Sequence, residues 1–141
     1  MAFLSSIDIS GSALTAQRLR MDVISENIAN AETTTTDTGD PYRRRVCVLS
    51  ERPSFANSLS DAMSGGGGVM VSKIVEDQSD FELEYDPDNP LAGPDGYVRM
   101  PNVDEVEEII DLMEATRSYE ANVTALNATK DMAIKALEIG R

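Results

Sequence analysis

The feature that most constrains the fold of this chain is a seven-residue spacing of apolar side chains near its beginning. The residues at this spacing are Ile7, Leu14, Met21 and Ile28, and Ile24 widens the stripe that they form. A repeat of seven residues keeps one narrow apolar seam of a helix pointed at a partner helix. The spacing predicts a helix over residues 1–31, with Ser10 or Ser12 as the candidate cap. The run Thr33–Thr36 ends it, because β-branched residues disfavour helix continuation.

A second apolar seam lies near the end of the chain. Its positions alternate by three and four residues, and its large side chains are Ile109, Leu112, Tyr119, Val123, Leu126 and Leu137. This alternation predicts a helix over residues 103–141 with a seam of the coiled-coil kind. Asn102 is the predicted N-cap, and Glu105 three residues later would complete a capping box. Gly140 is the predicted stop.

The middle of the chain has short runs of β-branched and aromatic residues between turn residues. The candidate strands are Arg44–Ser50, Val69–Glu76, Phe81–Tyr85 and Tyr97–Met100. Residues 32–102 are therefore predicted to form a small β-rich insertion, whereas residues 1–31 and 103–141 together form one helical domain. The predicted fold is mainly α, with the terminal helices paired antiparallel as a coiled-coil-like hairpin that the insertion joins at one end only.

The longer of the two predicted helices would extend past its partner. At 1.5 Å per residue, the first helix is expected to reach about 35 Å and the second about 50 Å. With no Trp, 3 Phe and 4 Tyr, the core of an isolated subunit is expected to be aliphatic and thin. The excess seam is therefore predicted to be buried against other subunits. A soluble two-helix adaptor or secretion chaperone, which would use the same seams to hold one partner helix, is the alternative.

Composition argues against several classes of function. The 25 acidic and 12 basic residues leave a net charge of −13, so neither nucleic acid nor anionic lipid is an expected partner. No run approaches the roughly 20 apolar residues that a membrane span requires, and the first residues lack the features of a cleaved secretory signal. Histidine is absent, which removes the usual general base and the commonest metal ligand. We therefore expect no enzyme, no catalytic residue, no cofactor and no metal.

Two features of the first candidate strand have structural explanations. Cys47, the only cysteine, stands between Val46 and Val48, which predicts a buried and unreactive thiol. Arg43 and Arg45 would share one face of a strand. They would form either a solvated strand edge or a contact with acidic surface on a neighbouring copy.

Two other local patterns resemble ligand sites but do not match them. Asp86, Asp88 and Asn89 do not fit an EF-hand loop, because proline and leucine take the fifth and sixth positions. A turn is predicted there instead. The run Gly65–Gly68 lacks the Lys-Ser or Lys-Thr of a phosphate-binding loop and is predicted to be a flexible linker.

Several segments of the chain resemble a known family. Residues 14–25 (LTAQRLRMDVIS) and 27–31 (NIANA) are similar to the N-terminal signature of bacterial flagellar axial proteins, the rod and hook subunits. The segments that resemble proximal rod members of that family are PYRR at 41–44, NPLA at 89–92, GYV at 96–98, MPNVD at 100–104, RSYEAN at 117–122 and KALEIGR at 135–141.

The resemblance implies a mechanical role. Proteins of this family form the proximal rod of the flagellar basal body, a drive shaft that crosses the periplasm and transmits torque. Their terminal helices line the inner core of a helical tube, with the β-rich middle outside. They leave the cell through the flagellar type III export apparatus without a cleaved signal peptide, and their partners are further copies and other rod subunits.

The residues that the family motifs single out are Asn27, Asn30, Pro101, Asn102 and Asp104. Asn27 and Asn30 come near the end of the first predicted helix, where asparagine caps a helix or satisfies loop backbone. A contact with another subunit is the other interpretation of these two residues. The seam residues are expected to pack partly within one subunit and partly between subunits.

Overall fold

The computed structural model describes residues 2–52 and 67–139, with side chains from residue 5 onward. Its elements are α1 (Ala2–Ala29), β1 (Arg45–Glu51), β2 (Val69–Glu76), β3 (Glu82–Tyr85), β4 (Tyr97–Met100) and α3 (Glu105–Ile139). The prediction of two long terminal helices around a small β-rich middle is confirmed. Two of the candidate strands have the predicted bounds, and the other two differ from them by one residue.

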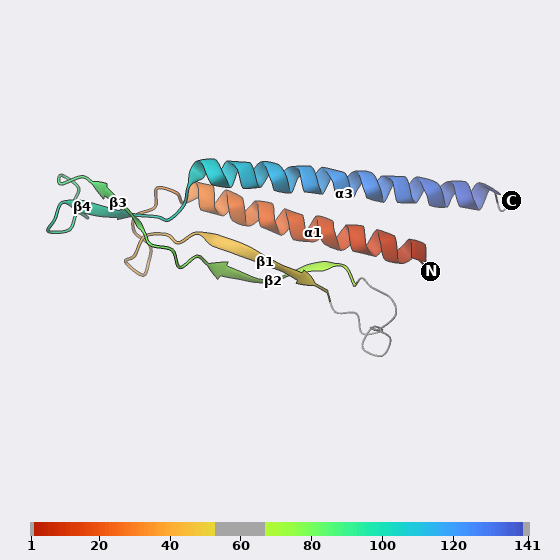
Figure 1. Ribbon diagram of the computed structural model, residues 1–141, viewed down its shortest axis with the longest axis horizontal. Helices are drawn as coiled ribbons and strands as arrows, with labels where there is room; N and C mark the ends of the chain where they lie inside the picture. The colour runs from red at the N-terminus through yellow and green to blue at the C-terminus, as the bar shows by residue number, and fades with distance from the viewer. Residues whose placement is uncertain (1, 53–66, 140–141) are drawn as a thin grey trace.

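The two helices lie side by side and run in opposite directions (Figure 1). α3 has 35 residues and α1 has 28, which correspond to about 52 Å and 42 Å. The last turns of α3 therefore pass beyond the start of α1, as the unequal seams predicted (Figure 1).

The strands form two separate antiparallel hairpins, β1–β2 and β3–β4. β3–β4 lies beyond the end of the helix pair at which α1 ends and α3 begins, whereas β1–β2 runs back along α1 on the side away from α3 (Figure 1). The insertion leaves α1 and enters α3 at one end of the helix pair, as predicted, and β1–β2 in addition packs along α1 (Figure 1). The alternation of β2 explains this packing, because it leaves Val69 and Val71 half-buried in a surface shared with Ala16 of α1.

The connection between β3 and β4 contains the turn that the sequence predicts in place of a calcium loop. The amide of Leu91 donates to Asn89 Oδ1 over 3.0 Å, and the amide of Asn89 donates to the carbonyl of Asp86 over 3.4 Å. Across the hairpin, the rings of Tyr85 and Tyr97 meet edge to face with centroids 5.2 Å apart.

Ser12 lies inside α1, which begins before it, so the prediction that Ser10 or Ser12 caps the helix is wrong. Ser12 joins the helix to the β1–β2 hairpin instead. Its Oγ donates to the carbonyl of Ile9 over 2.7 Å and accepts from the amide of Val69 over 3.0 Å.

The end of the glycine run packs against this serine. Gly68 is buried with φ at +92°, and a Cβ at that position would lie 2.5 Å from Ser12 Oγ. The carbonyl of Gly68 also accepts from the amide of Arg52 over 2.9 Å. The prediction of a plain linker is therefore wrong for Gly68, whereas Gly65 and Gly66 lie outside the described residues.

α3 is capped by Asp104 and not by Asn102. Asp104 Oδ1 accepts from the amides of Val106, at 2.8 Å, and Glu107, at 3.2 Å, as an N-cap carboxylate does. Glu105 is then the first helical residue, so the predicted capping box does not form. Gly140, the predicted stop, lies outside the described residues.

The core of the described chain is thin and mostly aliphatic, as the scarcity of aromatic residues predicts. The buried apolar residues are Ala16, Val23, Ile24, Ala31, Tyr42, Val98, Val103 and Ala115. Ala31, Tyr42 and Val103 form one cluster next to the junction between the helices and β1. Because this core is small, polar contacts at the junction take a large part in holding the elements together.

Candidate functional site

Asn27 lies at the centre of the junction where α1, β1 and α3 meet, and its residue surface is 1% exposed. Its Nδ2 donates to the carbonyl of Arg45 over 2.9 Å, and its Oδ1 accepts from the amide of Arg45 over 3.0 Å. A neighbouring strand would make the same pair of bonds to a residue of an antiparallel ladder. The Asn27 carboxamide therefore takes the place of a strand at the beginning of β1.

Glu108 lies beside Asn27 and is also 1% exposed. Its Oε2 accepts from Asn27 Nδ2 over 2.9 Å, and its Oε1 accepts from Arg44 Nε over 2.6 Å. A carboxylate removed from water destabilises the fold unless it is paired and hydrogen-bonded. Here both oxygens have a donor, and the donors come from α1 and from the residue that precedes β1.

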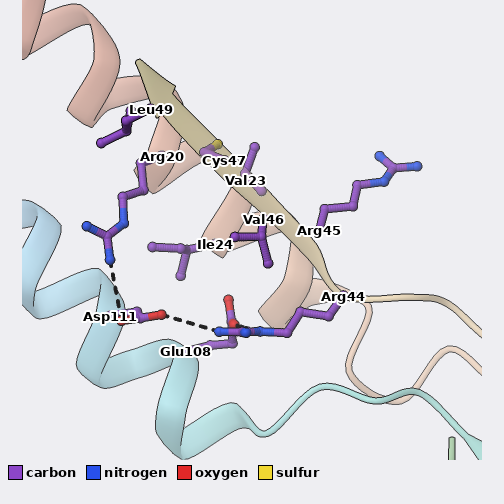
Figure 2. A pocket seen from close by; sticks show the side chains of 10 residues that line it. All are labelled: Arg20, Val23, Ile24, Arg44, Arg45, Val46, Cys47, Leu49, Glu108 and Asp111. Atoms are coloured by element: carbon purple, nitrogen blue, oxygen red, sulfur yellow. Dashed lines mark hydrogen bonds and ion pairs between the residues drawn. The ribbon is translucent and has the colours of Figure 1, made fainter. Parts of the chain in front are cut away.

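The ion pairs continue from Glu108 along the surface of the junction. Arg44 Nη2 lies 3.3 Å from Asp111 Oδ2, and Arg20 Nη2 lies 3.5 Å from Asp111 Oδ1 (Figure 2). Burial alone would lower the pKa of Arg44, but the hydrogen bond and the charge of Glu108 outweigh it and raise that pKa above its ordinary value. The guanidinium therefore stays charged and joins α3 to the start of β1.

Tyr42 completes the bonding of Asn27 from the apolar side. Its hydroxyl donates to Asn27 Oδ1 over 3.0 Å, and its ring is buried. Burial, with a contribution from the carboxylate of Glu26, raises the pKa of Tyr42. The hydroxyl therefore keeps the proton that it donates at every pH near neutrality.

Asn102 binds the same segment from the other side. Its Oδ1 accepts from the amide of Arg44 over 2.9 Å, and its Nδ2 donates to the carbonyl of Asp77 over 3.3 Å and to Ser79 Oγ over 2.7 Å. These bonds explain why Asn102 is not available to cap α3. Pro101, immediately before it, is one of the most deeply buried side chains of the described chain.

Four of the five motif residues therefore meet at one junction, although a long interval of sequence separates Asn27 from the other three. Asn27, Pro101 and Asn102 are built into it, and Asp104 begins the helix that carries Glu108. Asn30 makes local bonds only, with its Nδ2 donating to the carbonyl of Glu26 over 2.8 Å. Asn27 satisfies backbone, as one interpretation from the sequence had it, but that backbone belongs to Arg45 at the start of β1 and not to the end of its own helix.

A groove of about 270 Å³ opens beside the junction, between β1 and α3 (Figure 2). Val23 and Ile24 of α1 line it together with Val46, Cys47 and Leu49 of β1. Cys47 is half-buried and not buried as predicted. Burial raises the pKa of its thiol, with Arg20 opposing the shift, so the thiol is protonated near neutral pH and is not activated as a nucleophile.

Both arginines that the sequence left between a solvated edge and a neighbouring copy have partners in the same chain. Arg43 Nη1 donates to the carbonyls of Asp77 and Ser79, and its guanidinium lies 4.2 Å from the centre of the Phe81 ring. Arg45 Nη1 lies 2.7 Å from Glu26 Oε1.

Most of the predicted seam residues are buried or half-buried within the subunit, but two are exposed. Ile24 is buried, whereas the half-buried ones are Ile7, Leu14, Met21, Ile28, Leu112, Tyr119, Val123 and Leu126. Ile109 is 48% exposed and Leu137 is 75% exposed. Within the chain these two side chains pack little, and their part in assembly stays a prediction.

Glu108 and Arg44 were not identified as site residues from the sequence. The positions of α3 that are buried or half-buried at steps of four and three residues are Glu108, Leu112, Ala115, Tyr119, Asn122 and Leu126. This stripe shares alternate positions with the predicted seam but replaces Ile109 by Glu108. The sequence therefore does contain a sign of Glu108: a second seven-residue pattern that includes this carboxylate. The predicted seam was the neighbouring pattern, which has larger apolar side chains.

Comparison with known proteins shows similarity along the whole chain. The family "Flagella basal body rod protein" matches residues 7–35, and "Flagellar basal body rod FlgEFG protein C-terminal" matches residues 95–139. "Flagellar basal-body rod protein FlgC" of Bacillus subtilis (strain 168) is 55% identical over 150 aligned residues, which cover 100% of each chain.

The similarity extends to distant bacteria. The protein of the same name in Escherichia coli O6:H1 is 45% identical, with 100% of each chain covered. That of Borreliella burgdorferi is 43% identical, with 99% of this chain and 98% of the relative covered. No helix in the described part of the chain combines the length and the apolar character needed to cross a membrane.

Proposed function

This chain belongs to the FlgC family of flagellar basal-body rod proteins, and from that premise we propose how it works as a structural subunit of the rod. The resemblance that its motifs predicted is confirmed, and so is the prediction that it is not an enzyme, because the family is a structural one.

The junction of Asn27, Arg44 and Glu108 is the load-carrying joint of the subunit. It joins the helix pair to the start of β1 through hydrogen bonds of Asn27 and Glu108. Both of these residues are 1% exposed. Short, charge-assisted hydrogen bonds of this kind resist displacement more than surface ion pairs do. The observation that carries the proposal is this buried network of hydrogen bonds, at the point where α1 and α3 meet the start of β1.

The helices assemble through the seam residues as a coiled-coil-like pair that neighbouring subunits complete. The steps of four and three residues along α3 support this packing, and so do the exposed apolar residues on its last turns. A contact repeated with a rise and a rotation gives an open helical array. In such an array the terminal helices form the inner domain of a tube, and the hairpins of residues 32–102 lie outside it.

The partners of the chain are further copies and other rod subunits, and the assembled rod crosses the periplasm and transmits torque. The chain reaches that site through the flagellar type III export apparatus without a cleaved signal peptide. Both statements rest on membership of the family and on the resemblance of the terminal segments.

Basal bodies from cells that lack the native gene test the proposal. Such cells are complemented with the wild-type chain, with Asn27→Ala, or with the control Asn30→Ala, in which a neighbouring asparagine with local bonds is lost. Asn27→Ala is expected to abolish rods in electron micrographs and motility in soft agar, whereas Asn30→Ala keeps both. Normal rods with Asn27→Ala would remove the joint from the proposal. Absence of the wild-type chain from purified basal bodies would remove the proposed function itself.

A further inference from the structure

The hairpin β3–β4 has one uncovered face, which we call the tyrosine face. Its members form two cross-strand pairs, Leu83 with Arg99 and Tyr85 with Tyr97. Paired residues of an antiparallel hairpin, and residues two apart on one strand, point to the same side of the sheet. Leu83 and Tyr85 are each 65% exposed and Tyr97 is 46% exposed, whereas Val98, on the opposite side, is 3% exposed. Large apolar side chains gathered in the open mark a surface for another protein.

The two tyrosine rings of this face are held in place by the hairpin itself. They meet edge to face with centroids 5.2 Å apart. Gly96, with φ at +77°, brings the backbone of the turn so close to Tyr85 that a Cβ there would lie 2.9 Å from Cε2 of the ring. A side chain that is already ordered loses little conformational entropy when a partner binds. The tyrosine pair is therefore suited to anchor a contact.

The rings at the two ends of the hairpin differ in the cations beside them. Phe81 lies just before β3, and the guanidinium groups of Arg43 and Arg99 lie 4.2 Å and 4.6 Å from its ring centre. In the described part of the chain, no arginine or lysine lies over the ring of Tyr85 or Tyr97. The hairpin therefore fills the cation site of one ring from its own chain and leaves the tyrosine rings open.

The tip of the hairpin, next to these rings, is acidic. Residues 74–98 contain no Lys or Arg, and the loop that joins β3 to β4 carries Asp86, Asp88 and Asp95. Among the ion pairs of residues 5–52 and 67–139, none involves these three acids. The tyrosine face therefore ends at carboxylates that no cation of the described chain neutralises.

We propose that the tyrosine face binds a protein other than this chain, and that this partner presents an arginine to it. The guanidinium lies over the ring of Tyr85 and pairs with the acids of the tip, while an apolar side chain of the partner covers Leu83. The contact deepens the proposed function, on which its place in the rod rests, because it names a surface of the outer hairpins and the chemistry of its partner.

Charge and ring chemistry together select this partner. The whole chain carries a net charge of −13, so most of the surface of a second copy repels the acidic tip. A planar guanidinium stacks on an aromatic ring while its N–H groups bond to a carboxylate, whereas the ammonium group of lysine is a point charge. Because rings and unpaired carboxylates adjoin here, a basic surface with an arginine on it is the complement.

Titration of the full chain with two short peptides tests the surface. The probe is the capped peptide Ala-Arg-Leu-Arg-Ala, and the control peptide has citrulline, an uncharged isostere, in place of each arginine. Binding is followed by the ring-proton NMR signals of Tyr85 and Tyr97. We expect the arginine peptide to shift these signals and to bind about tenfold more tightly than the control, which corresponds to about 1.4 kcal/mol. Ring signals that do not move, or equal affinities of the two peptides, overturn the proposal.

Substitutions separate the tyrosine face from general attraction of a cationic peptide to an acidic chain. Tyr85→Phe keeps the ring and is expected to keep the affinity, whereas Tyr85→Leu is expected to lower it about fivefold. Asp88→Asn is expected to lower it about threefold, and Glu114→Gln, which removes the same charge from α3, by less than about twofold. Urea unfolding shows that each exposed variant stays folded. Equal affinities of Tyr85→Leu and the wild-type chain overturn the proposal.

Photo-cross-linking in purified basal bodies separates this contact from the proposed function. The photoreactive residue p-benzoylphenylalanine replaces Leu83, or, as the control, the exposed Glu84 on the opposite face of β3. We expect only the first chain to join a different basal-body protein, at a segment whose arginine is needed for the product.

A product with a second copy of this chain, the same product from both positions, or no product while the chain is present, overturns the contact and leaves the rod function standing. If the chain is absent from the basal body, the rod function fails, and the peptide titration still decides whether the tyrosine face binds arginine.

Discussion

The two ends of the helix pair are completed in opposite ways. At the junction end, Asn27 and Glu108 are each 1% exposed, and the side-chain oxygens and nitrogen of both have partners in the same chain. At the free end, Leu137 and Ile139 are 75% and 86% exposed. The junction therefore completes its polar contacts within the subunit, whereas the free end leaves large apolar side chains exposed.

The difference follows from the nature of the two interactions. Hydrogen bonds are directional and costly when unmade, so a buried polar network has to be finished within the chain that folds. Burial of apolar area is non-directional and scales with the area removed from water. On the proposed function, the aliphatic side chains at the free end are therefore suited to a neighbouring subunit, while the junction fastens the start of β1 to both helices.

The largest effect on stability is expected at the junction. Glu108→Ala leaves Arg44 without its buried partner and Asn27 Nδ2 without one of its acceptors. Removing one partner of a buried ion pair lowers the free energy of unfolding by about 3–5 kcal/mol. Urea unfolding followed by far-UV circular dichroism measures the change. Glu114→Ala, an exposed acid of the same helix, is the control and is expected to change it by less than about 0.5 kcal/mol. Equal effects would mean that the junction is not the stabilised end.

A smaller effect is expected where β1–β2 is fastened to α1 away from the junction. Gly68 and Gly39 both have positive φ, +92° and +85°. A Cβ at Gly68 would meet Ser12 Oγ at 2.5 Å, whereas nothing lies within 4 Å of one at Gly39. Gly39→Ala is expected to lower the free energy of unfolding by about 1 kcal/mol through backbone strain, and Gly68→Ala by about 1–3 kcal/mol more through overpacking. If both alanine variants unfold at the same urea concentration, the Ser12 contact does not hold the hairpin.

A still smaller effect, dependent on pH, is expected at Tyr42. Tyr42→Phe removes one hydrogen bond to Asn27 and is expected to lower the free energy of unfolding by about 1 kcal/mol. Because the folded-state pKa of Tyr42 is raised, the unfolded chain loses the phenol proton at a lower pH than the folded chain. The contribution of the hydroxyl is therefore full below the ordinary tyrosine pKa of about 10 and decreases as the pH rises above it.

Urea unfolding of the wild-type chain and Tyr42→Phe at a series of pH values checks this. The difference between the two chains is expected to be constant from neutral pH up to about pH 9 and to shrink above about pH 10. The titration of Cys47, whose pKa burial also raises, occurs in both chains and cancels in the difference. A difference that grows above pH 10 would contradict the sign of the shift.

The elements of the fold could be predicted from local pattern, because seven-residue steps and short β-branched runs depend on neighbours in the sequence. The polar junction could not. Asn102 and Asp104 are both good N-caps two residues apart. Asp104 takes the role because Asn102 accepts from the amide of Arg44, which is 58 residues away in the chain.

The same reason applies to Glu108. Near the start of α3 it is one acid among several that suit a helix N-terminus. Its burial depends on Arg44 and Asn27 arriving beside it, and that approach is set by the path of the chain between α1 and β1. Spacing within the helix cannot show it. The family motifs did mark Asn27, but they carry no geometry, so they did not distinguish a cap or a subunit contact from the bonds to Arg45 and Glu108.

The smallest effect on stability, and the sharpest separation of the two ends, is expected at Leu137. In the isolated chain this side chain is 75% exposed, so Leu137→Ser is expected to change the free energy of unfolding by less than about 0.5 kcal/mol. Ile24→Ala, at a residue 5% exposed in the seam near the junction, is expected to lower it by about 2–5 kcal/mol. In cells, Leu137→Ser should nevertheless reduce the number of rods seen in basal-body preparations. Normal rod numbers would show that the free end needs no cover from other subunits, and an unstable Leu137→Ser monomer would show that the end is already packed. Either result would remove the contrast between the junction end and the free end of the helix pair. The apolar seam would then be complete within one chain, as the polar junction is.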